Sequence, residues 1–323
     1  TMGDPAGIGP EVILRALLHS SAVRDSCIPV VIGDRVVMEE AVRLPGLSVK
    51  LNIIRTPEEA KGTPGSIDMI DLALLASFEK RRPTAEGGSA SAAYIRRAVE
   101  LAVNKQVDAV VTAPISKEAL KMAGLHWPGH TEMIAELTGT KDFAMMLAGG
   151  PLRVILVTIH TSLRNVPELV TKEKVLKTIR LAKKACSMLG ISHPGIAVAG
   201  LNPHAGESGI FGDEETREII PAIEAAKVEG ISATGPFPPD TVFIRAYKGE
   251  VDIVVCMYHD QGLIPLKMIA FDKGVNVTIG LPIIRTSPDH GTAYDIAWSG
   301  KAVKADPASM IEALKLALQL KPA

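Results

Sequence analysis

Short apolar runs alternate along this chain with longer segments of helical periodicity, and this alternation constrains the fold more than any other feature. Most of the short runs are apolar at nearly every position, which is typical of strands buried on both faces. They cover residues 29–32, 51–54, 107–113, 153–159, 196–200, 251–257 and 275–279. The helical patterns between them cover 66–80, 89–104, 171–189 and 213–228. The sequence therefore predicts an α/β fold with a mainly parallel sheet.

Composition excludes several classes of protein. Of the 323 residues, 47% are hydrophobic, which is ample for a core and excludes a chain that is disordered as a whole. The 35 Lys and Arg residues against 36 Asp and Glu leave no basic excess to neutralise phosphates, which argues against a general nucleic-acid binder. No run of about 18 apolar residues is free of charges, so we expect no membrane span. The length predicts two domains, at roughly 150 residues per domain.

Cysteine usage indicates a reducing compartment. Cys27, Cys186 and Cys256 are far apart and form no CxxC pair, which fits a cytoplasmic protein without a disulfide scaffold. No signal region is visible. The chain starts at Thr1 directly in front of a glycine-rich turn, and we expect a few residues of a first strand to be missing before it.

A histidine follows three of the predicted strands at nearly the same position. His160 follows the run 153–159, while His204 and His259 come shortly after 196–200 and 251–257. Ligands of open α/β sheets bind beyond the carboxyl ends of strands, so three imidazoles delivered there can converge on one metal ion. A single histidine after a strand is more often an ordinary satisfied polar residue, and the shared position is what favours the metal. Three nitrogen ligands favour zinc, cobalt or nickel over magnesium.

Other polar residues suit a phosphorylated acid. His130 and Thr131 open a helical pattern, and a helix N-terminus with an imidazole and a hydroxyl is a suitable anion site, although Thr131 can equally serve as a cap. Lys267 and Arg285 can each pair with phosphate or carboxylate, although either alone is more often a solvated charge. Asn276 lies within an apolar strand pattern, where its amide needs a partner.

The glycine-rich turn at residues 3–11, GDPAGIGPE, superficially suggests a dinucleotide fingerprint. Val12 stands where the third glycine of GxGxxG belongs, so the turn gives little support to a Rossmann fold. No Walker A sequence and no GxSxG elbow occur. A nucleotide-dependent kinase and a serine hydrolase therefore have little support.

Six blocks in a fixed order resemble one known family. They are GDPAGIGPE at 3–11, TAP at 112–114, PGHTE at 128–132, NPHAGE at 202–207, MYHDQG at 257–262 and DHGTA at 289–293. Together they resemble the 4-hydroxythreonine-4-phosphate dehydrogenase family of vitamin B6 biosynthesis over nearly the whole chain. The resemblance implies two α/β/α domains of the isocitrate/isopropylmalate dehydrogenase type, with the active-site cleft between them. We expect 1–127 with 280–323 to form one domain, and 128–279 to form the domain with the metal ligands and dimer contacts.

The resemblance also implies a set of site residues. The implied metal ligands are the three histidines found above at strand ends: His160, His204 and His259. The implied substrate contacts are His130, Thr131, Lys267, Asn276 and Arg285. The segment 290–297, HGTAYDIA, resembles the loop that holds the adenosine end of NAD in isopropylmalate dehydrogenases, and its implied cofactor contacts are His290, Gly291, Thr292 and Asp295. Three candidates for the general base remain open: Asp240, Asp260 and Lys267.

The activity implied is an NAD- or NADP-linked oxidation of 4-phosphohydroxy-L-threonine to a 3-keto acid, which decarboxylates to 3-amino-2-oxopropyl phosphate in pyridoxal phosphate biosynthesis. It implies one divalent ion per site (zinc, cobalt or magnesium) and a homodimer whose active sites are shared across the interface, with no nucleic-acid or membrane partner. Relatives act on D-threonate or D-erythronate 4-phosphate in sugar-acid catabolism, and the segments 238–243 and 262–267 are somewhat closer to that branch. An aromatic-acid dihydrodiol is a less expected substrate, because Lys267 and Arg285 are retained.

Two other classes use part of the same pattern. A three-histidine zinc hydrolase would use the same ligands but would need neither NAD nor the segment 290–297. A sensor derived from an enzyme fold would have lost ligands or basic contacts, and no such loss is visible in the sequence.

Overall fold

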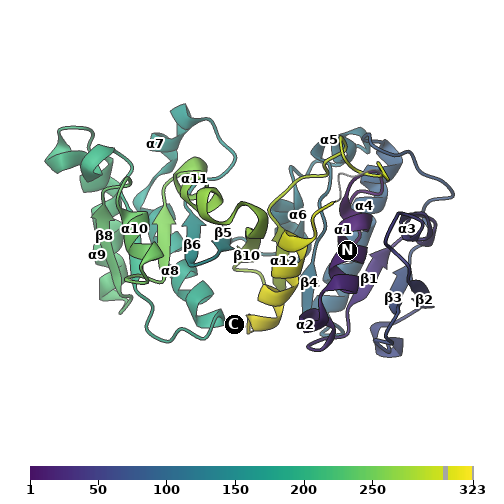
Figure 1. The fold of residues 1–323 in the computed structure, drawn as a ribbon. Helices are drawn as coiled ribbons and strands as arrows, with labels where there is room; N and C mark the ends of the chain where they lie inside the picture. The colour runs from purple at the N-terminus through teal and green to yellow at the C-terminus, as the bar shows by residue number, and fades with distance from the viewer. Residues whose placement is uncertain (301–304, 322–323) are drawn as a thin grey trace. The chain divides into compact units, whose positions relative to one another are not determined.

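The computed structural model describes residues 1–300 and 305–321 (Figure 1). The chain divides into two compact units: unit 1 comprises Thr1–Lys141 and Pro282–Gln319, and unit 2 comprises Asp142–Leu281 and the residues from Leu320 onward. The predicted domain boundaries at 127/128 and 279/280 differ from this division, because helix α6 (His130–Leu137) packs on helix α4 (Ala85–Val103) of unit 1. Residues 301–304 and 322–323 of the predicted first domain lie outside the described residues.

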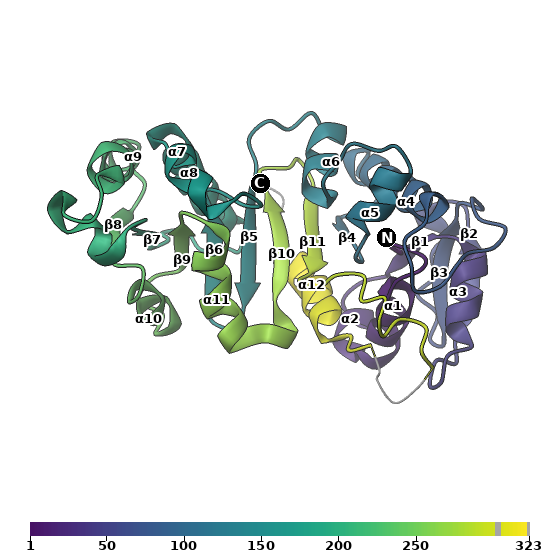
Figure 2. The same ribbon diagram turned by 90° about the horizontal axis from the view of Figure 1, so that it is seen from above.

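Unit 1 has three layers. One group of parallel strands consists of β1 (Val30–Gly33), β3 (Ser66–Asp71) and β2 (Lys50–Ile54), in the spatial order β1-β3-β2. A second group is the parallel pair of β4 (Ala109–Val111) and β11 (Ile284–Pro288). Backbone hydrogen bonds of Thr1 and Met2 join the two groups, since Met2 N–H donates to Ile32 and Ala113 N–H donates to Thr1. Helices α1 (Gly9–His19) and α12 (Ala308–Gln319) cover one face, and α4 covers the other (Figure 2).

The remaining helices of unit 1 are short. They are α2 (Ser21–Arg24), α3 (Arg35–Val42), α5 (Lys117–Met122) and a 3₁₀ turn at Pro57–Glu59. α4 begins after Thr84, whose side chain accepts a hydrogen bond from Gly87 N–H at 3.0 Å, as an N-cap does. Its backbone then passes so close to α5 that a Cβ on Gly88 would lie 2.1 Å from the carbonyl oxygen of Ala119.

Unit 2 is built on a twisted sheet of mixed direction. The strands are β10 (Val275–Ile279), β5 (Ala144–Gly149), β6 (Leu152–Leu156), β9 (Ile253–Cys256), β7 (Ile196–Ala199) and β8 (Ala233–Phe237), in this spatial order (Figure 2). β5 runs antiparallel to both of its neighbours, and β6, β9, β7 and β8 are parallel to one another. Helices α8 (Lys172–Met188) and α9 (Ile220–Val228) lie on one face, and α10 (Val242–Tyr247) and α11 (His259–Ala270) lie on the other.

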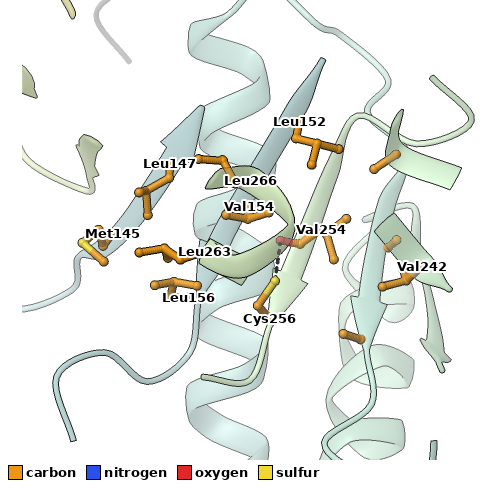
Figure 3. Packing of buried hydrophobic residues seen from close by; sticks show 13 residues of the cluster. Met145, Leu147, Leu152, Val154, Leu156, Val242, Val254, Cys256, Leu263 and Leu266 are labelled. Atoms are coloured by element: carbon orange, nitrogen blue, oxygen red, sulfur yellow. Dashed lines mark hydrogen bonds between the residues drawn. The ribbon is translucent and has the colours of Figure 1, made fainter. Parts of the chain in front are cut away.

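The core of unit 2 lies between its sheet and α11 (Figure 3). Leu263 and Leu266 of α11 pack against Leu147, Val154 and other buried residues of the strands. The helix approaches the hairpin of β5 and β6 so closely that a Cβ on Gly149 would lie 2.8 Å from the Cβ of Ala270. This packing fixes the position of α11, whose first residue is His259.

Short elements complete unit 2. They are helix α7 (Val166–Leu169), 3₁₀ segments at Leu163–Asn165, Pro203–Gly209 and Phe271–Lys273, and a π-helical turn at Glu215–Ile219. No helix among the described residues combines the length and the apolar character needed to cross a membrane.

The predicted helix at 66–80 is wrong. Residues Ser66–Asp71 form β3 between β1 and β2, where the side chain of Asp68 accepts hydrogen bonds from Lys61 N–H and Gly62 N–H. Pairing with two strands on either side outweighs the local helical pattern. The predictions also missed β5, β8 and β11, whereas the helices expected at 89–104, 171–189 and 213–228 are confirmed by α4, α8 and the π-helical turn that continues into α9.

The contact between α4 and α5 predicts an unusual effect of an alanine substitution. Gly88→Ala improves helix propensity by about 1 kcal/mol, but its Cβ would overlap the Ala119 backbone, which cannot rotate away. We expect a net decrease of about 1–3 kcal/mol in the free energy of unfolding, measured in urea. The adjacent, exposed Ser89→Ala is the control and should leave stability unchanged or slightly higher; an equal gain in both variants would contradict the close packing.

Candidate active site

The three strands that precede the predicted metal ligands are neighbours in unit 2. β9 lies between β6 and β7 and pairs parallel with both, with Val154 opposite Val254 and Ile196 opposite Ile253. The carboxyl ends of the three strands therefore share one edge of the sheet, the edge at which ligands bind in open α/β folds. The segments leading to His160, His204 and His259 all leave the sheet there.

His160 and His259 lie near each other, with ring centroids 5.7 Å apart. Nδ1 of His259 is 2.7 Å from Oδ1 of Asp260, the next residue of α11. A carboxylate on one ring nitrogen orients an imidazole and increases its basicity as a metal ligand through the other nitrogen. Asp260, one of the predicted bases, is thus engaged with a predicted ligand.

His204 is held differently from the other two histidines. It begins a run of left-handed backbone from 204 to 208, with φ of 53° at His204, and its ring centroid is 6.0 Å from that of Phe211. Within the described residues, no group of three or more His, Cys, Asp or Glu side chains is arranged to hold a metal ion. The three-histidine site therefore stays a prediction.

A buried carboxylate holds the turn that carries His204. Oε1 of Glu215 accepts hydrogen bonds from the N–H groups of Leu201 and Asn202, both at 2.7 Å, and Oε2 accepts from the Asn202 amide at 2.9 Å. Left-handed conformations at non-glycine residues are strained and persist only where the surroundings fix them. Glu215 fixes the backbone at Leu201 and Asn202, directly before this left-handed run. Sequence analysis missed this role, because Glu215 is one of several acidic residues in the first turn of a predicted helix.

A buried cation lies in unit 1. Arg285 on β11 is 2% exposed, and its Nη2 donates to the hydroxyl of Thr112 at 2.8 Å. Burial lowers the pKa of its guanidinium to about 10, so the group stays charged at neutral pH. A buried charge is costly unless another charge compensates for it. The Glu132 carboxylate stabilises the charged form, and a guanidinium can also pair with a phosphate or carboxylate group.

The predicted substrate contacts His130 and Thr131 also lie in unit 1, in the first turn of α6, and Thr131 is buried. Burial and then the nearby Arg285 lower the pKa of the His130 imidazole well below its usual range. Its Nε2 is buried with no hydrogen-bond partner among the residues that the structure describes. A neutral imidazole with one unpaired buried nitrogen can exchange a hydrogen bond with a ligand.

The other predicted residues of this group belong to unit 2. Lys267 is half-buried on α11, two turns after His259 and thus about 12 Å further along the helix axis. Asn276 lies on β10, with its Nδ2 3.0 Å from the sulfur of Met145. Asp240 is exposed in the turn before α10.

The predicted cofactor loop packs against the glycine-rich turn near the start of unit 1. Ile8 N–H donates to the carbonyl of Thr292 at 2.8 Å, and the hydroxyl of Tyr294 donates to Asp4 at 2.7 Å. Arg81 holds the same loop by donating to the carbonyls of Tyr294 and Asp295 at 3.0 and 2.5 Å. The two sequence blocks that resemble isopropylmalate dehydrogenases are therefore in direct contact, although 280 residues separate them. Sequence reasoning missed Arg81.

Residues 25–317 match the family described as pyridoxal phosphate biosynthetic protein PdxA. The chain belongs to this family. It is 53% identical to a 4-hydroxythreonine-4-phosphate dehydrogenase of Desulfosudis oleivorans over 98% of this chain and 94% of the relative, and 49% identical to a D-threonate 4-phosphate dehydrogenase of Cupriavidus necator over 99% and 96%. The predicted family and the predicted class of enzyme, an oxidoreductase, are confirmed.

Solved structures support the fold. A crystal structure of 4-hydroxythreonine-4-phosphate dehydrogenase from Klebsiella pneumoniae has a TM-score of 0.90 and 45% identity, covering 99% of this chain and 97% of that one. A β-decarboxylating dehydrogenase from Thermococcus kodakarensis, at 13% identity and a TM-score of 0.52, shares the fold alone. The predicted fold class is thus confirmed for this PdxA-family chain.

Because its imidazole is buried, we predict that His130 keeps the same protonation state near neutral pH. Because the pKa of His130 is lowered in the folded state, its ring stays neutral where an ordinary histidine, with a pKa near 6.5, takes up a proton. We expect the ring signals of His130, assigned with a His130→Gln variant, to stay constant between about pH 8 and 6 in NMR spectra. The same signals should titrate in concentrated urea, where unfolding removes the burial.

The same shift has a consequence for stability. The unfolded state binds a proton at His130 that the folded state does not, so this residue lowers stability as the pH falls below about 6.5. A midpoint near 6.5 for His130 in the folded protein would contradict its burial beside Arg285.

Proposed function

We propose that this chain oxidises 4-phosphohydroxy-L-threonine with a nicotinamide cofactor to the 3-keto acid, which decarboxylates to 3-amino-2-oxopropyl phosphate in pyridoxal phosphate biosynthesis. The observation that carries the proposal is the 53% identity, over 98% of the chain, to a relative that bears the name of this activity. The buried, charged Arg285 supports it as a group that suits an anionic substrate.

The second candidate is oxidation of D-threonate or D-erythronate 4-phosphate by the same chemistry. Its support is the 49% identity to a relative named D-threonate 4-phosphate dehydrogenase, only slightly below that of the first candidate. The two substrate classes differ at carbon 2, which carries an amino group in one and a hydroxyl group in the other.

The donor set in unit 2 fits a divalent ion. His160, His204 and His259 would hold it, since imidazole suits zinc and cobalt, and Asp260 already orients His259 through its Nδ1. Magnesium is the third candidate. When bound, such an ion would act as a Lewis acid toward substrate oxygens. The turn of His204, now against Phe211, is the part we propose must rearrange for binding.

When bound, NAD or NADP would supply the redox chemistry as the hydride acceptor. We propose that the loop residues His290, Gly291, Thr292 and Asp295 contact it. Hydrogen bonds to Asp4 and Arg81 hold this loop in place. The preference between NAD and NADP stays open.

Charged and polar residues of the chain bind and orient the substrate. Arg285 pairs with an anionic group, and His130 and Thr131 offer a neutral imidazole and a hydroxyl beside it. Lys267 and Asn276 provide further contacts from unit 2. The proton of the 3-hydroxyl goes to a base; because Asp260 is engaged with His259, we propose Lys267 or Asp240 for this role.

We propose a homodimer, with α11 in the contact. Its outer face exposes Ile264, Met268 and, just beyond its end, Phe271, with Met268 82% exposed. Large apolar side chains gathered on one exposed face are typical of an interaction surface. Because α11 also carries His259 and Lys267, a partner docked there would lie beside the proposed site. A cytoplasmic location stays a prediction.

The experiment that tests the substrate compares three compounds. NAD and NADP reduction is followed at 340 nm with added divalent metal, using 4-phosphohydroxy-L-threonine, D-threonate 4-phosphate and D-erythronate 4-phosphate. We expect kcat/KM to be highest for the amino acid. A higher value for either hydroxy acid would assign the chain to sugar-acid catabolism, and no reduction with any of the three would contradict both candidates.

Because the guanidinium of Arg285 is buried, we predict that a substitution there weakens substrate binding. Arg285→Lys keeps the charge but loses the forked donor geometry, so we expect the KM for the phosphorylated substrate to rise about 10- to 100-fold with a smaller effect on kcat. Arg15→Lys is a matched control, because Arg15 is also buried but pairs with Glu11 within α1. An unchanged KM in a folded Arg285→Lys variant would remove Arg285 from the site.

A further inference from the structure

The backbone of Met257 connects two of the histidine segments. Met257 lies two residues before His259, and its carbonyl accepts hydrogen bonds from the hydroxyl of Thr158 at 2.8 Å and from the N–H of Thr158 at 3.2 Å. Thr158 in turn lies two residues before His160. The side chain and the backbone of Thr158 therefore both tie the segment of His160 to that of His259.

Gln261 makes the corresponding connection on the other side. Its Oε1 accepts from the N–H of Met257 at 2.6 Å, and its Nε2 donates to the carbonyl of Gly200 at 2.8 Å. Gly200 begins the turn that leads to His204. A single carboxamide in the first turn of α11 thus joins the segments of His259 and His204.

These side-chain bonds lie at the end of the strand pairing, where the last backbone bond between the β6 and β9 segments runs from Thr158 N–H to the Met257 carbonyl. The pairing of β6 with β9 reaches Leu156 opposite Cys256, and that of β9 with β7 reaches Val198 opposite Val255. The histidines follow three to six residues later, beyond the reach of the sheet. Thr158 and Gln261 extend the connection of the three strands into this region.

Both side chains are shielded from water, Thr158 with 5% and Gln261 with 7% of its surface exposed. Buried hydrogen bonds between groups with no alternative partner are sensitive to the loss of either member. Neither side chain bonds to an imidazole or extends the sheet, and all their bonds go to the backbone of the three ligand-bearing segments. This pattern is expected of groups that set the spacing of those segments.

We propose that Thr158 and Gln261 are positioning residues of the metal site, which set the backbone of the His160, His204 and His259 segments relative to one another. Metal affinity then depends on two residues that do not touch the ion. The inference rests on the proposed function, because it presupposes that the three histidines bind a divalent ion.

The test measures binding of Co²⁺ alone to the metal-stripped, full-length protein, by calorimetry and by the visible absorption of bound Co²⁺. Gln261→Met keeps the length of the side chain without its polar groups, and Thr158→Val keeps the shape without the hydroxyl. We expect both to weaken Co²⁺ binding about 10- to 100-fold, the usual effect of losing an outer-shell partner, and to alter the absorption bands. Thr158→Ser, which retains the hydroxyl, should restore affinity to within about threefold of the wild type.

Two controls separate positioning from general stability. Thr178→Val removes a similarly buried threonine hydroxyl, bonded to the carbonyl of Lys174 within α8, and should leave Co²⁺ affinity unchanged. His204→Ala removes a proposed ligand and gives the affinity expected when the ligand set is incomplete. Circular dichroism establishes that each variant is folded; should Gln261→Met fail to fold, the Thr158→Val and Thr158→Ser pair decides the question.

The outcomes distinguish the two proposals. A wild-type protein that binds no Co²⁺ would overturn the metal site of the proposed function and the inference with it. Wild-type binding that is weakened by His204→Ala but not by Thr158→Val would overturn the inference alone. Equal weakening by Thr158→Val and Thr178→Val would also overturn it, because the effect would then be one of stability.

Discussion

Backbone groups that lose their strand partners where a buried strand ends must find other partners, and this constraint shapes both units of the chain. In unit 2, the side chains of Glu215 and Gln261 accept hydrogen bonds from backbone N–H groups just after β7 and β9 end. In unit 1, Asp34 accepts from the N–H of Leu74 after β3 and also from the hydroxyl of Tyr94, and Asp4 accepts from Ala6 N–H. Three of these side chains, Glu215, Gln261 and Asp4, lie beside segments that carry candidate site residues. Stability and site geometry therefore depend on the same few buried polar groups.

The electrostatics of the two units differ in a way that suits the proposed chemistry. Unit 1 buries a cation, Arg285, which donates to the hydroxyl of Thr112 and interacts with the Glu132 carboxylate, and it holds a neutral imidazole at His130. Unit 2 brings histidines to the edge of its sheet, with Asp260 beside His259. A guanidinium can pair with an anionic group, whereas imidazoles oriented by a carboxylate favour a cation.

The apolar strands and the histidines after them could be predicted because each is local in the sequence. The stretch 66–80 could not, since Ser66–Asp71 has a mixed pattern that only its pairing with β1 and β2 resolves. β5 is rich in Met, Ala and Gly rather than β-branched residues, so it lacks the usual strand signal. The roles of Gln261, Glu215 and Arg81 could not be predicted for another reason. Each bonds to a backbone group of a segment distant in the sequence, and polar residue type alone gives no sign of such a partner.

To distinguish the two candidate substrates, the site has to recognise only the substituent at carbon 2. Both carry the same phosphate, carboxylate and oxidisable hydroxyl, so the residues that bind these groups cannot distinguish them. The difference is an ammonium group, which only donates hydrogen bonds, against a hydroxyl group, which donates and accepts. An acceptor such as a carboxylate favours the ammonium, and a donor beside carbon 2 favours the hydroxyl. Relatives of both names share about half of their residues with this chain. The choice between the two substrates therefore depends on the polar groups that face carbon 2, and not on the groups that bind the phosphate and the carboxylate.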